Sequence, residues 1–171
     1  TAKEPAASTA QSTKAPAARP AAAKTANELY GPTYAAPDWF EDFHVELLVD
    51  RQEAVAVPLH SPVCIRYGFT LAQPVKDLNV TIAFYRKDGL LMSSISTLNG
   101  NLLKSVHEGR VQCEVTIPDF DLSPGSYVLV MPIHEGHSYL YREVVKEFVV
   151  VSGGQMTWGI KEFRYEYRIE S

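Results

Sequence analysis

Alternation of apolar and polar residues with a period of two is the feature that most constrains the fold of this chain. From about Phe43 onward it recurs in short runs rich in Val, Ile, Phe and Tyr, which turn residues separate at fairly regular spacing. Successive side chains of a strand point to opposite faces of a sheet, so each run predicts a strand that buries one face. The runs cover residues 43–49, 63–71, 78–85, 90–98, 110–117, 127–133, 139–151 and 158–169. This pattern predicts an all-β protein, an immunoglobulin-like antiparallel β-sandwich of seven to eight strands.

Two turns and one central run refine this prediction. Asp88-Gly89 lies between two runs and predicts a hairpin, because both residues tolerate a positive φ. Pro124-Gly125 is a turn that delivers Tyr127 into the start of a core strand, so we expect a structural role for this tyrosine. The run 127–133 is apolar on both faces, which predicts a central strand covered by the opposite sheet on one side and by another element on the other. The sequence does not identify that second cover, and only a short turn near residues 99–107 resembles a helix.

The first 28 residues differ in composition from the rest of the chain. They contain no aromatic residue, consist mostly of Ala, Thr, Ser, Lys and Pro, and carry prolines at positions 5, 16 and 20. Such a segment cannot bury enough apolar surface to order itself. We therefore expect residues 1–28 to be a disordered, Ala/Pro-rich linker that acts as an extended tether, and residues 29–171 to form the β-sandwich domain.

Net charge and cysteine placement limit the classes of partner and the compartment. The formal charge is -4, so the chain has no excess of cations for a phosphate backbone, and we expect no nucleic-acid partner. No stretch approaches the roughly 20 apolar residues that cross a bilayer. Cys64 takes the outward phase of its run and Cys113 the inward phase of its own, which predicts two free thiols and fits a reducing compartment.

Motifs of enzymes and metal sites are weak in this sequence. Asp119 and Asp121 form a close pair of acids, but they precede a Pro-Gly turn where Asp caps its own backbone, and they are too close in sequence to face one another across a substrate. In His134-Glu135-Gly136-His137 the histidines are three apart around a glycine, so a hairpin tip is a better interpretation than a zinc motif. We expect no catalytic residue, no metal site and no cofactor.

Outward-facing polar and aromatic side chains remain as candidates for function. Proteins bind sugars on shallow sheet surfaces by placing an aromatic ring against the apolar face of the sugar and planar donors and acceptors around its hydroxyls. By alternation several such residues point outward, and the segment 138–142 is unusually rich in them. The candidate carbohydrate-binding residues are Arg66, Tyr85, His134, Tyr139, Tyr141 and Arg142.

Several short pieces of the sequence, which together span about residues 43 to 169, carry a resemblance in their order and spacing. They are residues 61–67, 78–82, 87–89, 122–127 and 146–150, the last followed by Gly153-Gly154. Their order and spacing resemble the C-terminal domain of Wzt, the nucleotide-binding subunit of bacterial ABC transporters that export O-antigen polysaccharide. An Asn-Thr pair expected after the Asp-Gly hairpin is absent, and Ser96-Thr97 is the nearest equivalent.

This resemblance implies a non-catalytic carbohydrate-binding module that recognises O-antigen polysaccharide, by its modified non-reducing end, and couples it to export. It also implies that an ATPase domain precedes residue 1, and that the module works with the membrane subunit of the transporter at the cytoplasmic face of the inner membrane. The family further implies a homodimer in which the last strand is exchanged. Ser152-Gly153-Gly154 can act as the hinge for this exchange, and the aromatic strand 163–169 can equally fold back on its own chain.

Two other classes of function stay open at this stage. An immunoglobulin-like protein-interaction domain would contact a partner protein through an exposed sheet edge or the last aromatic strand. A glycan-active enzyme would need two carboxylates placed across a groove.

Overall fold

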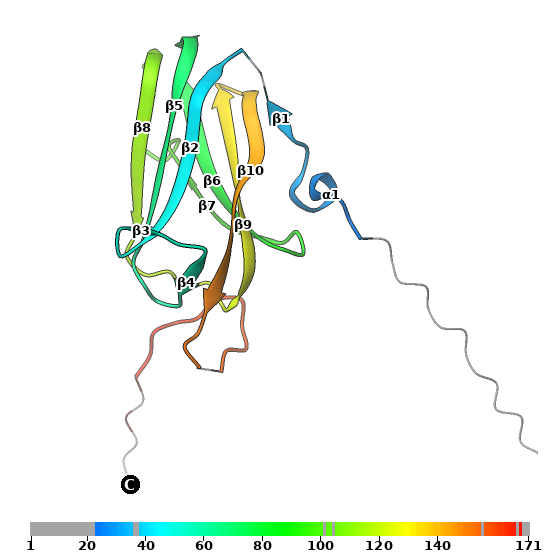
Figure 1. The fold of residues 1–171 in the computed structure, drawn as a ribbon, viewed down its shortest axis with the longest axis vertical. Coiled ribbons are helices and arrows are strands. Elements are labelled where there is room, and N and C mark those ends of the chain that lie inside the picture. Colours follow the sequence, from blue (N-terminus) through cyan, green and yellow to red (C-terminus); the bar gives the residue numbers. More distant parts are fainter. Residues whose placement is uncertain are drawn as a thin grey trace, which may run out of the picture.

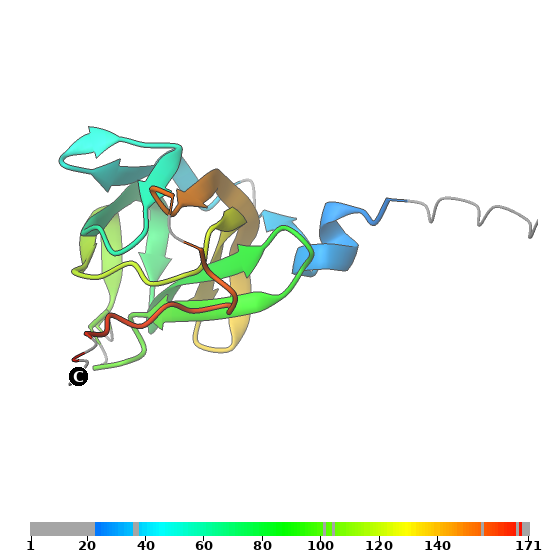
Figure 2. The same cartoon turned by 90° about the horizontal axis from the view of Figure 1, so that it is seen from below.

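The computed structural model describes residues 23–35, 38–100, 102–103, 105–154, 156–166 and 168. Within these ranges the chain forms one short helix and ten strands, which build two sheets packed face to face (Figures 1 and 2). The elements are α1 (Ala26–Tyr30), β1 (Tyr34–Ala35), β2 (Phe40–Val49), β3 (Gln52–Glu53), β4 (Ala56–Pro58), β5 (Val63–Val75), β6 (Leu78–Arg86), β7 (Leu91–Ser96), β8 (His107–Ile117), β9 (Gly125–Glu135) and β10 (Ser138–Val151). The seven longer strands match predicted runs, so the predicted immunoglobulin-like β-sandwich is confirmed.

The two sheets differ in size and in strand order. The six-stranded sheet has the order β1-β10-β9-β6-β7, with β4 paired in parallel to the end of β10. The four-stranded sheet has the order β3-β2-β5-β8. The hairpin of β6 and β7 turns at Asp88-Gly89, where Gly89 has a φ of 95° and Arg86 N–H donates to Leu90 O at 2.9 Å. The hairpin predicted from Asp-Gly is therefore confirmed.

The hydrophobic core lies between the sheets. On the four-stranded side β5 contributes Ile65, Tyr67 and Phe69, each of which is almost completely buried. On the other side β9 begins with Tyr127, which is buried and whose hydroxyl donates to Ser123 O at 2.5 Å. This hydrogen bond holds the turn in front of the strand, as the tyrosine corner of immunoglobulin-like domains does. The structural role predicted for Tyr127 is confirmed.

Both cysteines are free, as predicted. Cys113 pairs with the core residue Tyr67 across the β5–β8 ladder, which places its side chain on the core side. Cys64 alternates with buried residues on β5 and points to the outer face of the sheet. Burial raises the pKa of the Cys64 thiol, which keeps it protonated near neutral pH.

The helix α1 supplies the second cover of β9 that the sequence left unidentified. Val128 and Val130 point away from the main core, and together with Ala83 they form a second apolar cluster that Tyr30 and Leu29 cover. A capping box between Thr25 and Glu28 begins this helix. Residues 26–28, which were expected in the linker, lie in this helix, because the apolar pair Leu29-Tyr30 docks on the sheet; residues 1–22 lie outside the described residues. Within the described ranges no helix is long and apolar enough to cross a membrane.

The last segment does not form the predicted strand in its described part, residues 158–166 and 168. Its one ladder contact is an isolated bridge between Leu122 and Lys161. Its large side chains, which include Trp158 and Phe163, are mostly exposed. Alternation alone predicted a strand here, but a strand needs partners for its backbone groups, and the described part of the chain offers this segment only that single β-bridge. Positions 167 and 169 of the predicted strand lie outside the described residues.

Candidate functional site

Four of the six candidate binding residues lie on the outer face of the six-stranded sheet, the face turned away from the other sheet. They are Tyr85 on β6, His134 on β9, and Tyr139 and Arg142 on β10. His134 is the direct ladder partner of both Asn79 and Tyr139, so these three side chains form one row across β6, β9 and β10. We call the Asn79–His134–Tyr139 set the outer row.

The outer row combines an exposed aromatic ring with an unpaired imidazole nitrogen. Tyr139 is 47% exposed, and its ring stands edge to face against His134, with the ring centroids 4.1 Å apart. The His134 Nε2 atom is buried and has no hydrogen-bond partner among the described residues. Burial, followed by the positive charges of Arg142 and His137, lowers the pKa of His134 below its ordinary value. The imidazole is therefore neutral at pH 7 and keeps one nitrogen as an acceptor and one as a donor.

Polar groups continue the outer face next to the outer row. Thr81 lies two residues after Asn79 on β6 and therefore on the same face. Its hydroxyl donates to Ser96 Oγ of β7 at 2.9 Å. The Asn79 amide donates to Asp77 O at 3.0 Å, which fixes the side chain and leaves its amide oxygen as an acceptor. An exposed ring flanked by hydroxyl and amide groups has the chemistry that sugar binding requires.

Arg142 separates these polar groups from the apolar half of the outer face, which α1 covers. The Arg142 side chain is buried, and its guanidinium donates to Pro32 O at 3.0 Å, to Tyr30 O and to the Tyr85 hydroxyl at 3.4 Å. The Tyr85 ring in turn packs edge to face on Tyr30, with centroids 5.7 Å apart. Arg142 and Tyr85 are thus held by the segment that precedes the sandwich, at the border of the candidate site.

Tyr141 lies on the opposite side of the sheet from the outer row, which corrects its place among the candidates. Its ring packs between the sheets, 4.6 Å from the Phe43 ring and 5.9 Å from the Phe40 ring. The β9–β10 register shifts between Tyr139 and Tyr141, so Leu140 is an extra residue in β10. One extra residue reverses the alternation, and two tyrosines that the period of two places on one face lie on different faces.

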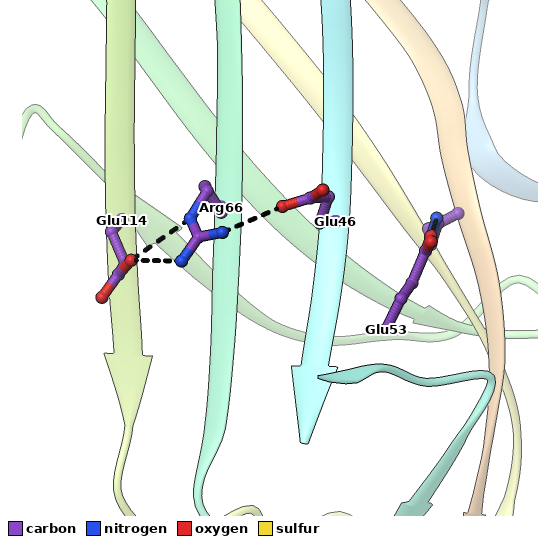
Figure 3. A network of polar contacts seen from close by, with 5 residues as sticks. Glu46, Glu53, Arg66 and Glu114 are labelled. Atoms are coloured by element: carbon purple, nitrogen blue, oxygen red, sulfur yellow. Dashed lines mark hydrogen bonds and ion pairs between the residues drawn. The ribbon is translucent and has the colours of Figure 1, made fainter. Parts of the chain in front are cut away.

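Arg66 points outward as predicted, but from the four-stranded sheet. It lies between two carboxylates, with Nη1 3.3 Å from Glu46 Oε2 and Nη2 3.1 Å from Glu114 Oε2 (Figure 3). A shallow cavity of about 440 Å³ lies beside it and also reaches Cys64. Because Arg66 belongs to the other layer of the sandwich, it cannot contact the same sugar as the outer row.

The two acids of the β8–β9 loop, Asp119 and Asp121, form ion pairs with the last segment of the chain. Asp119 contacts His60 Nδ1 at 2.8 Å and Arg164 Nε at 3.3 Å, and Asp121 contacts Lys161 Nζ at 3.0 Å. These contacts lower the pKa of the Asp119 carboxyl, chiefly through the hydrogen bond from His60. Both acids therefore hold neighbouring chain segments. In the described ranges, no group of three or more His, Cys, Asp or Glu residues is placed to hold a metal ion.

The outer row contains one residue that sequence reasoning missed as a site residue. Asn79 takes the outward phase of its run, which is visible in the sequence, but nothing in the sequence places it beside His134. That pairing depends on the β6–β9 register. The sequence likewise gave no sign that α1 would cover Tyr85.

Comparison with known proteins identifies a family. Residues 40–163 match the family described as the Wzt C-terminal domain. A crystal structure of the C-terminal domain of Wzt has the same fold, with a TM-score of 0.64 at 12% sequence identity over 78% of this chain and 92% of that one. A Niemann-Pick type C2 protein from the Japanese carpenter ant matches with a TM-score of 0.47 at 11% identity, over 66% of this chain and 91% of that one. No curated protein matches the sequence.

Proposed function

The chain belongs to the Wzt C-terminal domain family, and from this premise we propose that the outer row binds the modified non-reducing end of an O-antigen polysaccharide. The family gives the chain a non-catalytic, carbohydrate-binding role in O-antigen transport by ABC transporters. The fold does not say which surface does the binding. The proposal about the surface therefore depends on the side chains of the outer face.

The unpaired Nε2 of His134 beneath the exposed ring of Tyr139 is the observation that carries this proposal. A buried polar atom without a partner costs about 1–3 kcal/mol, and a ligand hydroxyl that pairs with it recovers part of that cost. Tyr139 lies against the imidazole, so a sugar that stacks on this ring comes close to His134. The ring itself offers a flat surface for the apolar face of a sugar. Asn79 supplies an amide oxygen for a further hydroxyl.

The C-terminal segment supports a proposal about assembly. Its large apolar side chains are exposed although ion pairs hold the segment to the β8–β9 loop, and a cavity of about 750 Å³ lies between it and Leu59-His60. Apolar side chains exposed over such a length mark an interaction surface. We assign this surface to a homodimer in which residues 156–168 pair with a second copy. The same surface is what a protein-interaction domain would use, which was the alternative function.

The wider context is part of the same proposal. The module works at the cytoplasmic face of the inner membrane, together with the membrane subunit of the transporter and an ATPase domain that precedes residue 1. The Ala/Pro-rich composition at the start of the chain supports a role as the tether between the ATPase and the module. A tether raises the effective concentration of the glycan end near the transporter, because a glycan that the module holds stays linked to the transporter and does not have to find it from solution.

A calorimetric titration tests the proposed function. The full chain is titrated with intact O-antigen polysaccharide from the source organism and, in parallel, with the same polysaccharide from which the terminal residue has been removed. We expect saturable binding of the intact form and at least about tenfold weaker binding of the shortened form, which corresponds to ~1.4 kcal/mol. Equal binding of both forms would contradict end recognition. No binding of either form to folded protein would overturn the glycan site and favour the protein-interaction function.

A further inference from the structure

Residues 25–35 form an arm that is docked on the outer face of the six-stranded sheet, next to the outer row. Figures 1 and 2 show α1 and β1 of this arm beside the sheet, on the side away from the four-stranded sheet. Tyr30 is the main apolar anchor, and its hydroxyl also donates to Lys87 O at 3.2 Å. At the end of the arm β1 pairs with β10, with Tyr34 opposite Arg142.

The fit between the arm and the sheet is close at two glycines. A Cβ on Gly89 would lie 2.8 Å from Leu29 O, so the β6–β7 turn can approach α1 only because this residue has no side chain. Gly31 has a φ of 85°, and a Cβ there would lie 3.1 Å from the Arg142 guanidinium nitrogens. The docked position of the arm is therefore specific to these residues rather than a loose apolar contact.

Arg142 connects the arm to the outer row. It binds backbone carbonyls of the arm through Nη1 and Nη2, and through Nη2 the hydroxyl of Tyr85. On its other side it stands on the same sheet face as His134, whose pKa its positive charge helps to lower. If the arm leaves, this buried guanidinium loses two carbonyl acceptors, and the side chain is free to move relative to the outer row.

We propose that the arm is a wall of the glycan site and that, through Arg142, arm docking and glycan binding stabilise one another. This inference rests on the proposed function of the outer row. Arg142 acts here as a positioning residue, since it holds the border of the site while Tyr139 and His134 contact the sugar. Coupling of this kind is reciprocal: a glycan that prefers the docked arm must strengthen docking by the same factor by which docking strengthens glycan binding.

Hydrogen exchange of the arm in the full chain tests this coupling from the glycan side. The reporters are the amides of Leu29 and Gly31, which donate to Thr25 O at 3.1 Å and to Asn27 O at 3.0 Å. Saturating intact O-antigen polysaccharide is expected to slow their exchange by about fivefold or more, the low end of usual coupling between sites.

The variant Gly31→Ala tests the coupling from the arm side. It strains a position of positive φ and crowds Arg142, but it removes no side chain of the outer face. Gly109→Ala is the matched control, because Gly109 has a similar φ of 73°, has no neighbouring atom within 4 Å of the added Cβ and lies on the four-stranded sheet. We expect Gly31→Ala to weaken binding of the intact polysaccharide by a factor similar to the exchange protection, and Gly109→Ala to bind as the natural chain does.

The outcomes separate the two proposals. Polysaccharide binding with unchanged arm exchange, or with equal affinities of the Gly31→Ala and Gly109→Ala variants, overturns the coupling and leaves the glycan site intact. Absence of polysaccharide binding to the natural chain overturns both. Slower arm exchange together with a selective loss of affinity in Gly31→Ala supports both, and a Tyr30→Ala variant should then repeat the loss.

Discussion

The two outer faces of this sandwich differ in whether their polar side chains have hydrogen-bond or ion-pair partners. On the four-stranded sheet, Arg66 is held between Glu46 and Glu114, so its charge is matched within the sheet (Figure 3). On the six-stranded sheet, His134 Nε2 has no partner among the described residues, and the Tyr139 ring beside it is half exposed. Where the polar groups of a face already pair with each other, a ligand adds little free energy by hydrogen bonding to them. Where a buried donor or acceptor is unpaired, a ligand that pairs with it gains free energy.

Replacement of Arg142 should have the largest effect on stability. Arg142→Met removes hydrogen bonds from a buried guanidinium to two carbonyls of the arm, and hydrogen bonds to charged groups contribute about 1.5–3 kcal/mol each. We expect the free energy of unfolding to fall by about 2–3 kcal/mol in urea titrations, less than the sum of two such bonds, because the methionine also removes the cost of burying a charge. Arg66→Met on the other face is the control and should cost clearly less. Equal losses would contradict the difference between the faces.

Removal of the Tyr139 ring should have the largest effect on binding. We expect Tyr139→Ala to weaken binding of intact O-antigen polysaccharide by about tenfold or more, or ~1.4 kcal/mol, in calorimetry. Tyr139→Phe keeps the ring and should stay within a few fold of the natural chain. Glu114→Gln, on the four-stranded face, should leave the affinity unchanged. An affinity lost in Glu114→Gln but kept in Tyr139→Ala would move the glycan site to the other sheet.

Acid should destabilise the fold through His134. Its pKa is lowered in the folded state, so below its ordinary value of about 6.5 the unfolded chain binds the proton more readily than the folded chain. The contribution of this group to stability is therefore complete above pH of about 6.5 and is lost as the pH falls from there towards the lowered pKa. His134→Gln should lose less stability between pH 7.5 and 5 than the natural chain does, measured by thermal unfolding. Parallel pH curves for the two proteins would contradict this assignment.

Loss of an ion pair among Glu46, Arg66 and Glu114 on the four-stranded face should have the smallest effect on stability. These three side chains are roughly two-fifths to a half exposed, and exposed ion pairs are weakened by solvent and salt. Glu46→Gln should lower the melting temperature only slightly, and the difference from the natural chain should vanish in about 1 M salt, where the Debye length is roughly 3 Å. A large, salt-independent decrease would mean that this face depends on these ion pairs more than their exposure indicates.

The sequence predicts the sandwich well because a period of two is a local property of each strand. The same period places Tyr85, His134 and Arg66 outward, as the structure has them. It fails at Leu140, where one extra residue in β10 turns Tyr141 towards the core while Tyr139 stays outside. A bulge depends on the partner strand, so no pattern within β10 reveals it.

Two further features depend on contacts between distant parts of the chain. The helix α1 is only five residues long, too short for a helical period, and it is stabilised by the apolar patch of β6 and β9 rather than by its own propensity. The last segment has the alternation of a strand, but its described residues form only one β-bridge to the described part of the chain. For α1 the missing information was a partner surface far away in sequence, and for the last segment it was the lack of a pairing strand among the described residues.

An NMR titration tests most directly which face of the sandwich binds the glycan. The amide and imidazole signals of the isotope-labelled full chain are followed while intact O-antigen polysaccharide from the source organism is added. We predict saturable shifts at Asn79, His134 and Tyr139, with the signals of Glu46, Arg66 and Glu114 unchanged. Saturable shifts confined to the four-stranded face, or the absence of shifts in the outer row, would contradict this prediction.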